Sequence, residues 1–175
     1  ARFLAGSEVT EVNAVGSVLV DPEIGEAGDV DTAVVTLKFE NGAIGIIDNS
    51  RKAVYGYDQR VEVFGSEGCA QNENDIPNTA VLSTANGTTY GTAYKVMWDR
   101  YTGAFVSEMQ AFADAVANDK ETPVTGIDGL YPVLMAAAAT KSLHEGRPEQ
   151  GSQFAVTTAA RSVAFFSAMI SEKLK

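Results

Sequence analysis

The chain has 175 residues, and its 13 Lys and Arg residues against 23 Asp and Glu residues give a net charge of −10 at pH 7. This acidity argues against a nucleic-acid partner and an anionic membrane surface, because both need clustered positive charge. The single cysteine excludes an internal disulfide framework and favours a cytoplasmic, reducing compartment, and the single histidine excludes a His-rich metal site. No apolar run reaches the roughly 20 residues that span a bilayer.

The first 30 residues are predicted to contain a helix end, a strand and a loop. Residues 1–6 have the pattern of a last helical turn that ends at a glycine, so we expect the chain to be a fragment of a longer protein. Residues 8–20 are rich in Val and small side chains, which favours a strand. The acidic residues 21–29 are predicted to be a solvated loop, because their spacing does not match the EF-hand calcium pattern.

Two alternating segments flank Asn41 and Gly42 and predict a β-hairpin with a two-residue type I′ turn. That turn pairs Phe39 with Ile44 and places both on an apolar core face. The opposite face is mixed and carries Val34, Thr36, Lys38, Gly45, Ile47, Asn49 and Arg51. Such a face is typical either of a partner contact or of scattered surface apolar side chains.

Short strands are predicted next, over residues 57–64, 69–72, 79–84 and 88–95. From Trp98 the apolar period changes from two to about 3.6, which predicts a long helix. Thr125 and Asp128 have the spacing of a capping box that opens a second helix, and Gly146 ends it.

Strands followed by helices predict an α+β fold, with an open, mainly antiparallel sheet and helices on one face. We expect residues 1–149 to form one domain. Residues 150–175 are predicted to form a C-terminal helical extension.

The chain lacks a dinucleotide-binding glycine motif, a phosphate loop and a nucleophile elbow. Its densest polar and aromatic cluster lies around Tyr55 and Tyr57, which point the same way in an extended strand. Paired phenols stack on a sugar ring and hydrogen-bond its hydroxyls, and Asn49 and Arg51 offer further polar groups for a polyol. Alternatively, the tyrosines are strand formers on a half-buried face with their hydroxyls already satisfied.

Residues 42–51 read Gly-Ala-Ile-Gly-Ile-Ile-Asp-Asn-Ser-Arg, and residues 55–65 read Tyr-Gly-Tyr-Asp-Gln-Arg-Val-Glu-Val-Phe-Gly. This string resembles the inositol 2-dehydrogenases of the glucose-fructose oxidoreductase (Gfo/Idh/MocA) family. The likeness extends over residues 29–148 and includes residues 77–80 and 123–129. Its most specific part is the joined string over residues 49–65.

The resemblance implies a substrate-binding and oligomerisation domain that binds a cyclic polyol or sugar through Tyr55 and Tyr57. It also implies a homodimer or homotetramer formed through the sheet face. Phe105 matches a family tyrosine, so the hydroxyl of that contact is lost. Residues 150–175 have no counterpart in the family pattern.

In the family, NAD or NADP is bound by a separate Rossmann domain, and the catalytic Lys, Asp and His lie upstream of the matched segment. None of these has a counterpart here, so we expect this chain alone to have no catalytic residue, cofactor, metal or dehydrogenase activity. Two alternatives remain open: another sugar dehydrogenase of the same family, and a non-enzymatic assembly module.

Overall fold

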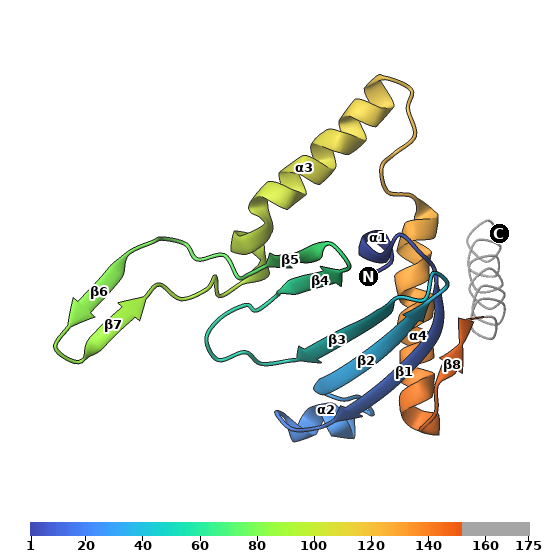
Figure 1. The fold of residues 1–175 in the computed structure, drawn as a ribbon, viewed down its shortest axis with the longest axis horizontal. Coiled ribbons are helices and arrows are strands. Elements are labelled where there is room, and N and C mark those ends of the chain that lie inside the picture. Colours follow the sequence, from blue (N-terminus) through green and yellow to red (C-terminus); the bar gives the residue numbers. More distant parts are fainter. Residues whose placement is uncertain (152–175) are drawn as a thin grey trace, which may run out of the picture. The chain divides into compact units, whose positions relative to one another are not determined.

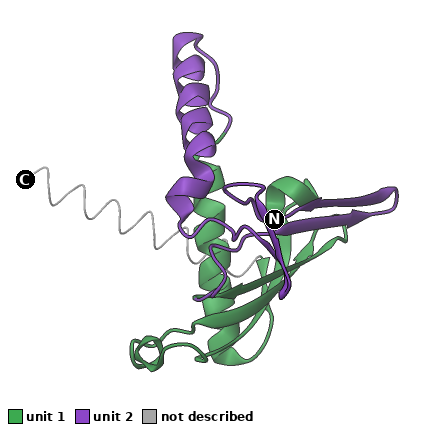
Figure 2. Ribbon diagram, turned by 90° about the vertical axis from the view of Figure 1, so that its left-hand side faces the viewer, with its two compact units in different colours: residues 1–51, 124–175 green, residues 52–123 purple. Residues whose placement is uncertain are grey.

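The structure, a computed structural model, describes residues 1–151 (Figure 1). The described residues divide into two compact units, with residues 1–51 and 124–151 in unit 1 and residues 52–123 in unit 2 (Figure 2). The helical extension predicted over residues 150–175 lies outside the described residues from residue 152 onward. The domain boundary expected at residue 149 therefore stays a prediction.

Unit 1 contains a four-stranded antiparallel sheet with the strand order β3-β2-β1-β8. Its elements are α1 (Arg2–Ala5), β1 (Val9–Ser17), α2 (Pro22–Glu26), β2 (Thr32–Phe39), β3 (Ile44–Ser50), α4 (Gly126–Glu145) and β8 (Glu149–Gln150). Helix α4 runs along one face of this sheet (Figure 1). The predicted α+β class with an open antiparallel sheet is confirmed, although α2 replaces part of the expected acidic loop.

The core of unit 1 lies between α4 and the sheet. Leu134 and Ala138 of α4 pack on three buried side chains of β1 and β2, namely Val12, Leu37 and Phe39. Val12 pairs with Leu37 across the two strands, so their side chains share the face that meets the helix. Burial of these apolar side chains is what fixes the helix on this side of the sheet.

Both predicted ends of α4 are confirmed. The Asp128 carboxylate accepts hydrogen bonds from the Thr125 backbone N–H at 2.9 Å and from its hydroxyl at 2.7 Å, within the predicted capping box. Gly146 closes the helix in the left-handed conformation with φ of 65°. Gly6 ends α1 in the same way, as the sequence pattern indicates.

The hairpin loop enclosed by the hydrogen-bonded residues Phe39 and Ala43 has three residues and is not the predicted type I′ turn. Gly42 has a φ of +87°, but Asn41 does not share the positive φ that type I′ requires at both central residues. The N–H of Phe39 donates to the carbonyl of Ala43 at 3.0 Å, which closes the longer loop. The predicted pairing is therefore wrong by one residue.

This one-residue shift exchanges the two faces of β3. Leu37 pairs with Gly45, and Ile44 and Ile46, which were predicted to face the core, are 74% and 69% exposed. A Cβ on Gly45 would lie 3.2 Å from the ring of Phe39, so this glycine makes room for a buried aromatic side chain. The face turned away from α4 is consequently the more apolar one at its β3 edge.

Unit 2 contains two separate two-stranded antiparallel sheets and one long helix. Its elements are β4 (Val61–Gly65), β5 (Gly68–Asn72), β6 (Val81–Thr84), β7 (Gly87–Tyr90) and α3 (Met97–Ala117). The strand predicted over residues 57–64 starts only at Val61, so the segment that carries Tyr57 is not part of a strand ladder. Among residues 1–151, no helix is both long and apolar enough to cross a membrane.

Candidate functional site

The polar segment 55–60 leads into β4 and is held against another part of unit 2 at Gly56. Gly56 has a φ of +139°, and a Cβ there would lie 2.9 Å from the carbonyl oxygen of Tyr94 and 3.0 Å from that of Ala93. The backbone N–H of Tyr57 donates to the Tyr94 carbonyl at 2.6 Å. Only glycine allows both this conformation and this close approach.

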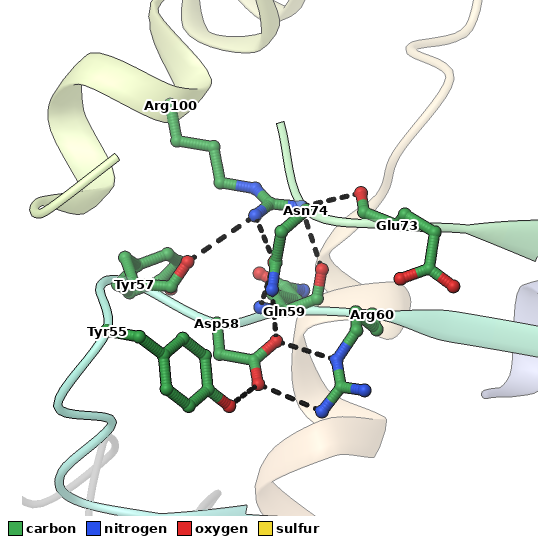
Figure 3. Close-up of polar contacts among 8 residues, drawn as sticks. All are labelled: Tyr55, Tyr57, Asp58, Gln59, Arg60, Glu73, Asn74 and Arg100. Atoms are coloured by element: carbon green, nitrogen blue, oxygen red, sulfur yellow. Dashed lines mark hydrogen bonds and ion pairs between the residues drawn. The ribbon is translucent and has the colours of Figure 1, made fainter. Parts of the chain in front are cut away.

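Asp58 is the centre of a hydrogen-bond network in this segment (Figure 3). Its carboxylate accepts from Nε and Nη2 of Arg60, each at 2.9 Å, from Nδ2 of Asn74 at 2.6 Å and from the Tyr55 hydroxyl. The bonds from Arg60, Tyr55 and Asn74 hold the pKa of Asp58 well below its usual range. Asp58 is therefore a fixed negative charge at neutral pH.

The same contact decides what the Tyr55 phenol can do. The hydrogen bond to Asp58 raises the pKa of Tyr55, so the phenol stays protonated. Its proton is already donated to Asp58, and Arg60 lies against its oxygen as a donor, which leaves one lone pair to accept a further hydrogen bond. Tyr55 as a whole residue is 54% exposed, so it is accessible to a ligand.

Tyr57 is held by a different contact, because its ring meets the ring of Tyr101 edge-on. The two ring centroids are 6.1 Å apart, and the ring planes are inclined at 87°. The Tyr101 hydroxyl donates to the side-chain oxygen of Gln59. Tyr55 and Tyr57 are therefore not two parallel phenols on one extended strand, as predicted from their spacing, but are positioned by separate partners.

Asn49 and Arg51 belong to unit 1, whereas Tyr55 and Tyr57 belong to unit 2. Asn49 pairs with Ala33, so it lies on the side of the sheet that α4 covers and not on the open face where the sequence placed it. Arg51 follows the end of β3, and its backbone N–H donates to the Asp31 carbonyl at 2.8 Å. Both side chains are exposed.

Sequence reasoning missed Asn74, Arg100 and Tyr101 as members of this network. Their contacts join segments that lie 15 or more positions apart in the chain, so no local pattern indicates them.

Phe105 is 38% exposed, and the centroid of its ring lies 5.9 Å from the centroid of the Trp98 ring.

The residues of this part of the chain do not fit a dinucleotide cofactor. The strand pairs over residues 1–151 are antiparallel, whereas the dinucleotide cradle needs a parallel strand–helix–strand unit with a glycine-rich turn. Within the same residues, no group of three His, Cys, Asp or Glu side chains is placed to hold a metal ion. The side chains around Asp58 offer hydroxyl, amide and charged groups, which can bind and orient a polar ligand.

Comparison with known proteins places this arrangement in a family. Residues 1–71 match the family model of the GFO/IDH/MocA C-terminal domain. The chain carries a GFO/IDH/MocA C-terminal domain. It is 51% identical over 148 residues to the uncharacterized oxidoreductase YrbE of Bacillus subtilis, a match that covers 85% of this chain and 43% of the relative. The myo-inositol 2-dehydrogenase of Thermotoga maritima is 49% identical over 147 residues, which are 84% of this chain and 44% of that protein.

Solved structures share the fold of this GFO/IDH/MocA domain. A probable dehydrogenase from Thermotoga maritima superposes with a TM-score of 0.84 at 46% identity, over 87% of this chain and 46% of that one. A scyllo-inositol dehydrogenase from Lactobacillus casei with bound NAD(H) and scyllo-inositol gives a TM-score of 0.78 at 25% identity, over 85% and 44% of the two chains. The chain thus spans less than half the length of these relatives.

Proposed function

We propose that this chain is the substrate-binding and oligomerisation domain of an NAD-dependent inositol 2-dehydrogenase and is inactive without a cofactor domain. The similarity to myo-inositol 2-dehydrogenase, together with the exposed Tyr55 phenol beside Asp58, carries the proposal. The reaction would transfer a hydride from a ring carbon to NAD or NADP. This domain contributes the orientation of the ring, and correct orientation lowers a reaction barrier by several kcal/mol.

In this proposal Tyr55 accepts a hydrogen bond from a ring hydroxyl, because its own proton is committed to Asp58. Tyr57 offers a ring whose orientation is fixed by Tyr101, and such a ring stacks on the apolar face of a cyclic polyol. Asn49 and Arg51 are proposed to bind the remaining hydroxyls. Both side chains are exposed and carry the amide and guanidinium groups that bind hydroxyls.

The cofactor is proposed to be held elsewhere, since the described residues do not fit it. The lone exposed cysteine, Cys69, agrees with work in a reducing compartment such as the cytoplasm. Subunit association is proposed to use the sheet face that α4 does not cover, where Val15, Val34, Ile44 and Ile46 are exposed. A homodimer or homotetramer would bury this apolar surface.

Titration calorimetry with myo-inositol tests the binding function directly. The parent chain is expected to bind, and Tyr55→Phe is expected to bind at least about fivefold more weakly because it loses one hydrogen bond and leaves Asp58 with one donor fewer. Tyr90→Phe is a matched control, since Tyr90 is 67% exposed on β7 in the same unit. Equal affinities of Tyr55→Phe and the parent would remove Tyr55 from the site.

The same titration separates the alternatives. Tighter binding of scyllo-inositol or glucose than of myo-inositol would favour another sugar dehydrogenase of the family. A stable oligomer without any polyol binding would favour an assembly module. Release of NADH by the purified chain from inositol and NAD would contradict the proposal that this chain is inactive alone.

A further inference from the structure

Arg100 of α3 joins two separate loops of unit 2 (Figure 3). Its Nη2 donates to the carbonyl of Gln59 at 2.7 Å, and its Nη1 donates to Oδ1 of Asn74 at 2.5 Å. Longer contacts of 3.5 Å reach the carbonyls of Tyr57 and Glu73. One guanidinium therefore holds the backbone on both sides of Asp58 and the loop that supplies Asn74.

These contacts replace the strand pairing that the segment lacks. The ladder of β4 with β5 begins at Val61, so residues 57–60 have no neighbouring strand to order their backbone. A planar guanidinium presents several donors in fixed directions and can bridge two carbonyls and an amide at once. A lysine ammonium is a single point of charge and cannot span the same set of acceptors.

Asn74 extends the effect of Arg100 to the Tyr55 phenol. Its Oδ1 accepts from Arg100 and from the backbone N–H of Gln59 at 2.9 Å, and its Nδ2 donates to Asp58 at 2.6 Å. Asp58 in turn accepts the proton of Tyr55. A continuous chain of hydrogen bonds thus runs from α3 to the exposed hydroxyl.

The geometry of α3 is adapted to this arrangement. Tyr101 has a φ of −107° and a ψ of 15°, which is not helical, so the helix is kinked directly after Arg100. The kink lets neighbouring residues of one helix reach the same segment, with Arg100 on the backbone and Tyr101 on the Tyr57 ring and the Gln59 side chain. Kinks of this kind need a local cause, and this one coincides with the two side chains that hold segment 57–60.

We propose that Arg100 is a positioning residue for polyol binding: it orders segment 57–60 and thereby fixes the Tyr55 hydroxyl and the Tyr57 ring without touching the ligand. This proposal rests on the proposed function. It predicts that ligand affinity depends on the planar guanidinium of Arg100, with its several donors in fixed directions, and not on the positive charge alone.

The test compares Arg100→Lys, Arg100→Met and the matched charge control Lys95→Met, which removes one positive charge at an exposed position of the same unit. Two quantities are measured in the full chain: the amide hydrogen-exchange rate of Gln59, with β4 amides as the reference, and the affinity for myo-inositol by calorimetry. Both Arg100 variants are expected to show at least about tenfold faster exchange at Gln59 and at least about tenfold weaker binding. Lys95→Met is expected to match the parent in both.

Full retention of slow exchange and affinity in Arg100→Lys would overturn the proposal, because a point charge would then suffice. Unchanged affinity in spite of faster exchange would overturn it as well. If Arg100→Met does not fold, Asn74→Ala replaces it in both measurements. This substitution removes the hydrogen bonds that link Arg100 to Asp58 through Asn74. Absence of binding by the parent would contradict the proposed function instead, and the exchange rate of Gln59 would then decide alone whether Arg100 orders the segment.

Discussion

Asp31 shows at the scale of one residue how a buried carboxylate stays ionised. It is 3% exposed, and it accepts the backbone N–H groups of Leu19, Val20 and Asp21 at 2.7 to 2.9 Å and the Thr32 hydroxyl at 2.9 Å. Burial alone would raise the pKa of Asp31, but these four donors lower it from 3.8 to about 2. The carboxylate thereby closes the connection from β1 to α2.

The lowered pKa of Asp31 gives a pH dependence with a definite sign. Because the folded pKa lies below the unfolded one, Asp31 stabilises the fold fully above the ordinary value of 3.8, and this is lost as the pH falls towards about 2. Asp31→Asn is expected to lower the Tm by at least about 4 °C near neutral pH, since an amide N–H₂ then faces backbone donors. The Tm difference from the parent is expected to shrink between about pH 4 and about pH 2.

Thermal unfolding followed by circular dichroism across this pH range checks the Asp31 prediction. Asp29→Asn is the control, because Asp29 is exposed and accepts one backbone hydrogen bond, from the N–H of Val30 at 2.8 Å, in the part of the chain that the structure describes. A Tm difference for Asp31→Asn that stays constant with pH would contradict the role given to the ionised carboxylate.

At the scale of elements, sequence patterns among neighbouring residues predicted the helices and their ends, because contacts between neighbouring residues determine these features. The sequence predicted helix α3 from the apolar period of three to four after Trp98. It also predicted both ends of α4, from the Thr125–Asp128 capping box and from Gly146. Each of these signals depends on neighbouring residues. The strand register of the hairpin could not be predicted from the sequence, because Asn41 and Gly42 fit loops of two or three residues equally well. Only packing of the Phe39 ring over Gly45 distinguishes them, and that is a contact between strands.

For the candidate site too, the sequence predicted the residues that are neighbours in the chain, but not the contacts between distant segments. Tyr55 and Tyr57 were found because they stand together in the sequence, but their extended geometry was wrong because Gly56 turns the backbone between them. Arg100 and Asn74 contribute through hydrogen bonds to distant segments, so their participation follows only from the folded structure.

The three-residue hairpin loop makes a prediction about Gly42. Its φ of +87° is unfavourable for a side chain, so Gly42→Ala is expected to destabilise unit 1 by about 1 kcal/mol. Gly129→Ala is the matched control, because Gly129 lies within α4 of the same unit, and a Cβ added there would meet no atom within 4 Å. It is expected to stabilise the unit by up to about 1 kcal/mol.

Urea unfolding of both glycine variants gives the two free energies. Opposite signs for Gly42→Ala and Gly129→Ala would agree with the observed loop. A stabilising Gly42→Ala would contradict the left-handed conformation of the hairpin.

At the scale of the whole molecule, the uncovered face of the sheet determines the proposed association. The register places Ile46 next to Thr36 on this face, while Lys38 of β2 forms an ion pair with Glu11 of β1 at 2.7 Å near the hairpin end of these strands. Exposed apolar side chains mixed with polar and charged groups are common at subunit interfaces. Two copies related by a two-fold axis would bring this face against itself.

Ile46→Glu tests that association, since it places a charge on the face that the second copy would cover. Analytical ultracentrifugation is expected to show a parent oligomer and a variant whose dissociation constant is raised at least about tenfold, because a carboxylate would be buried without a partner. Leu19→Glu is the matched control: Leu19 is 74% exposed in the same unit, but it lies in the connection after β1 and not on the sheet face. Equal weakening by both substitutions would assign the effect to net charge, and a parent that is monomeric at every concentration would remove the sheet face as the site of association.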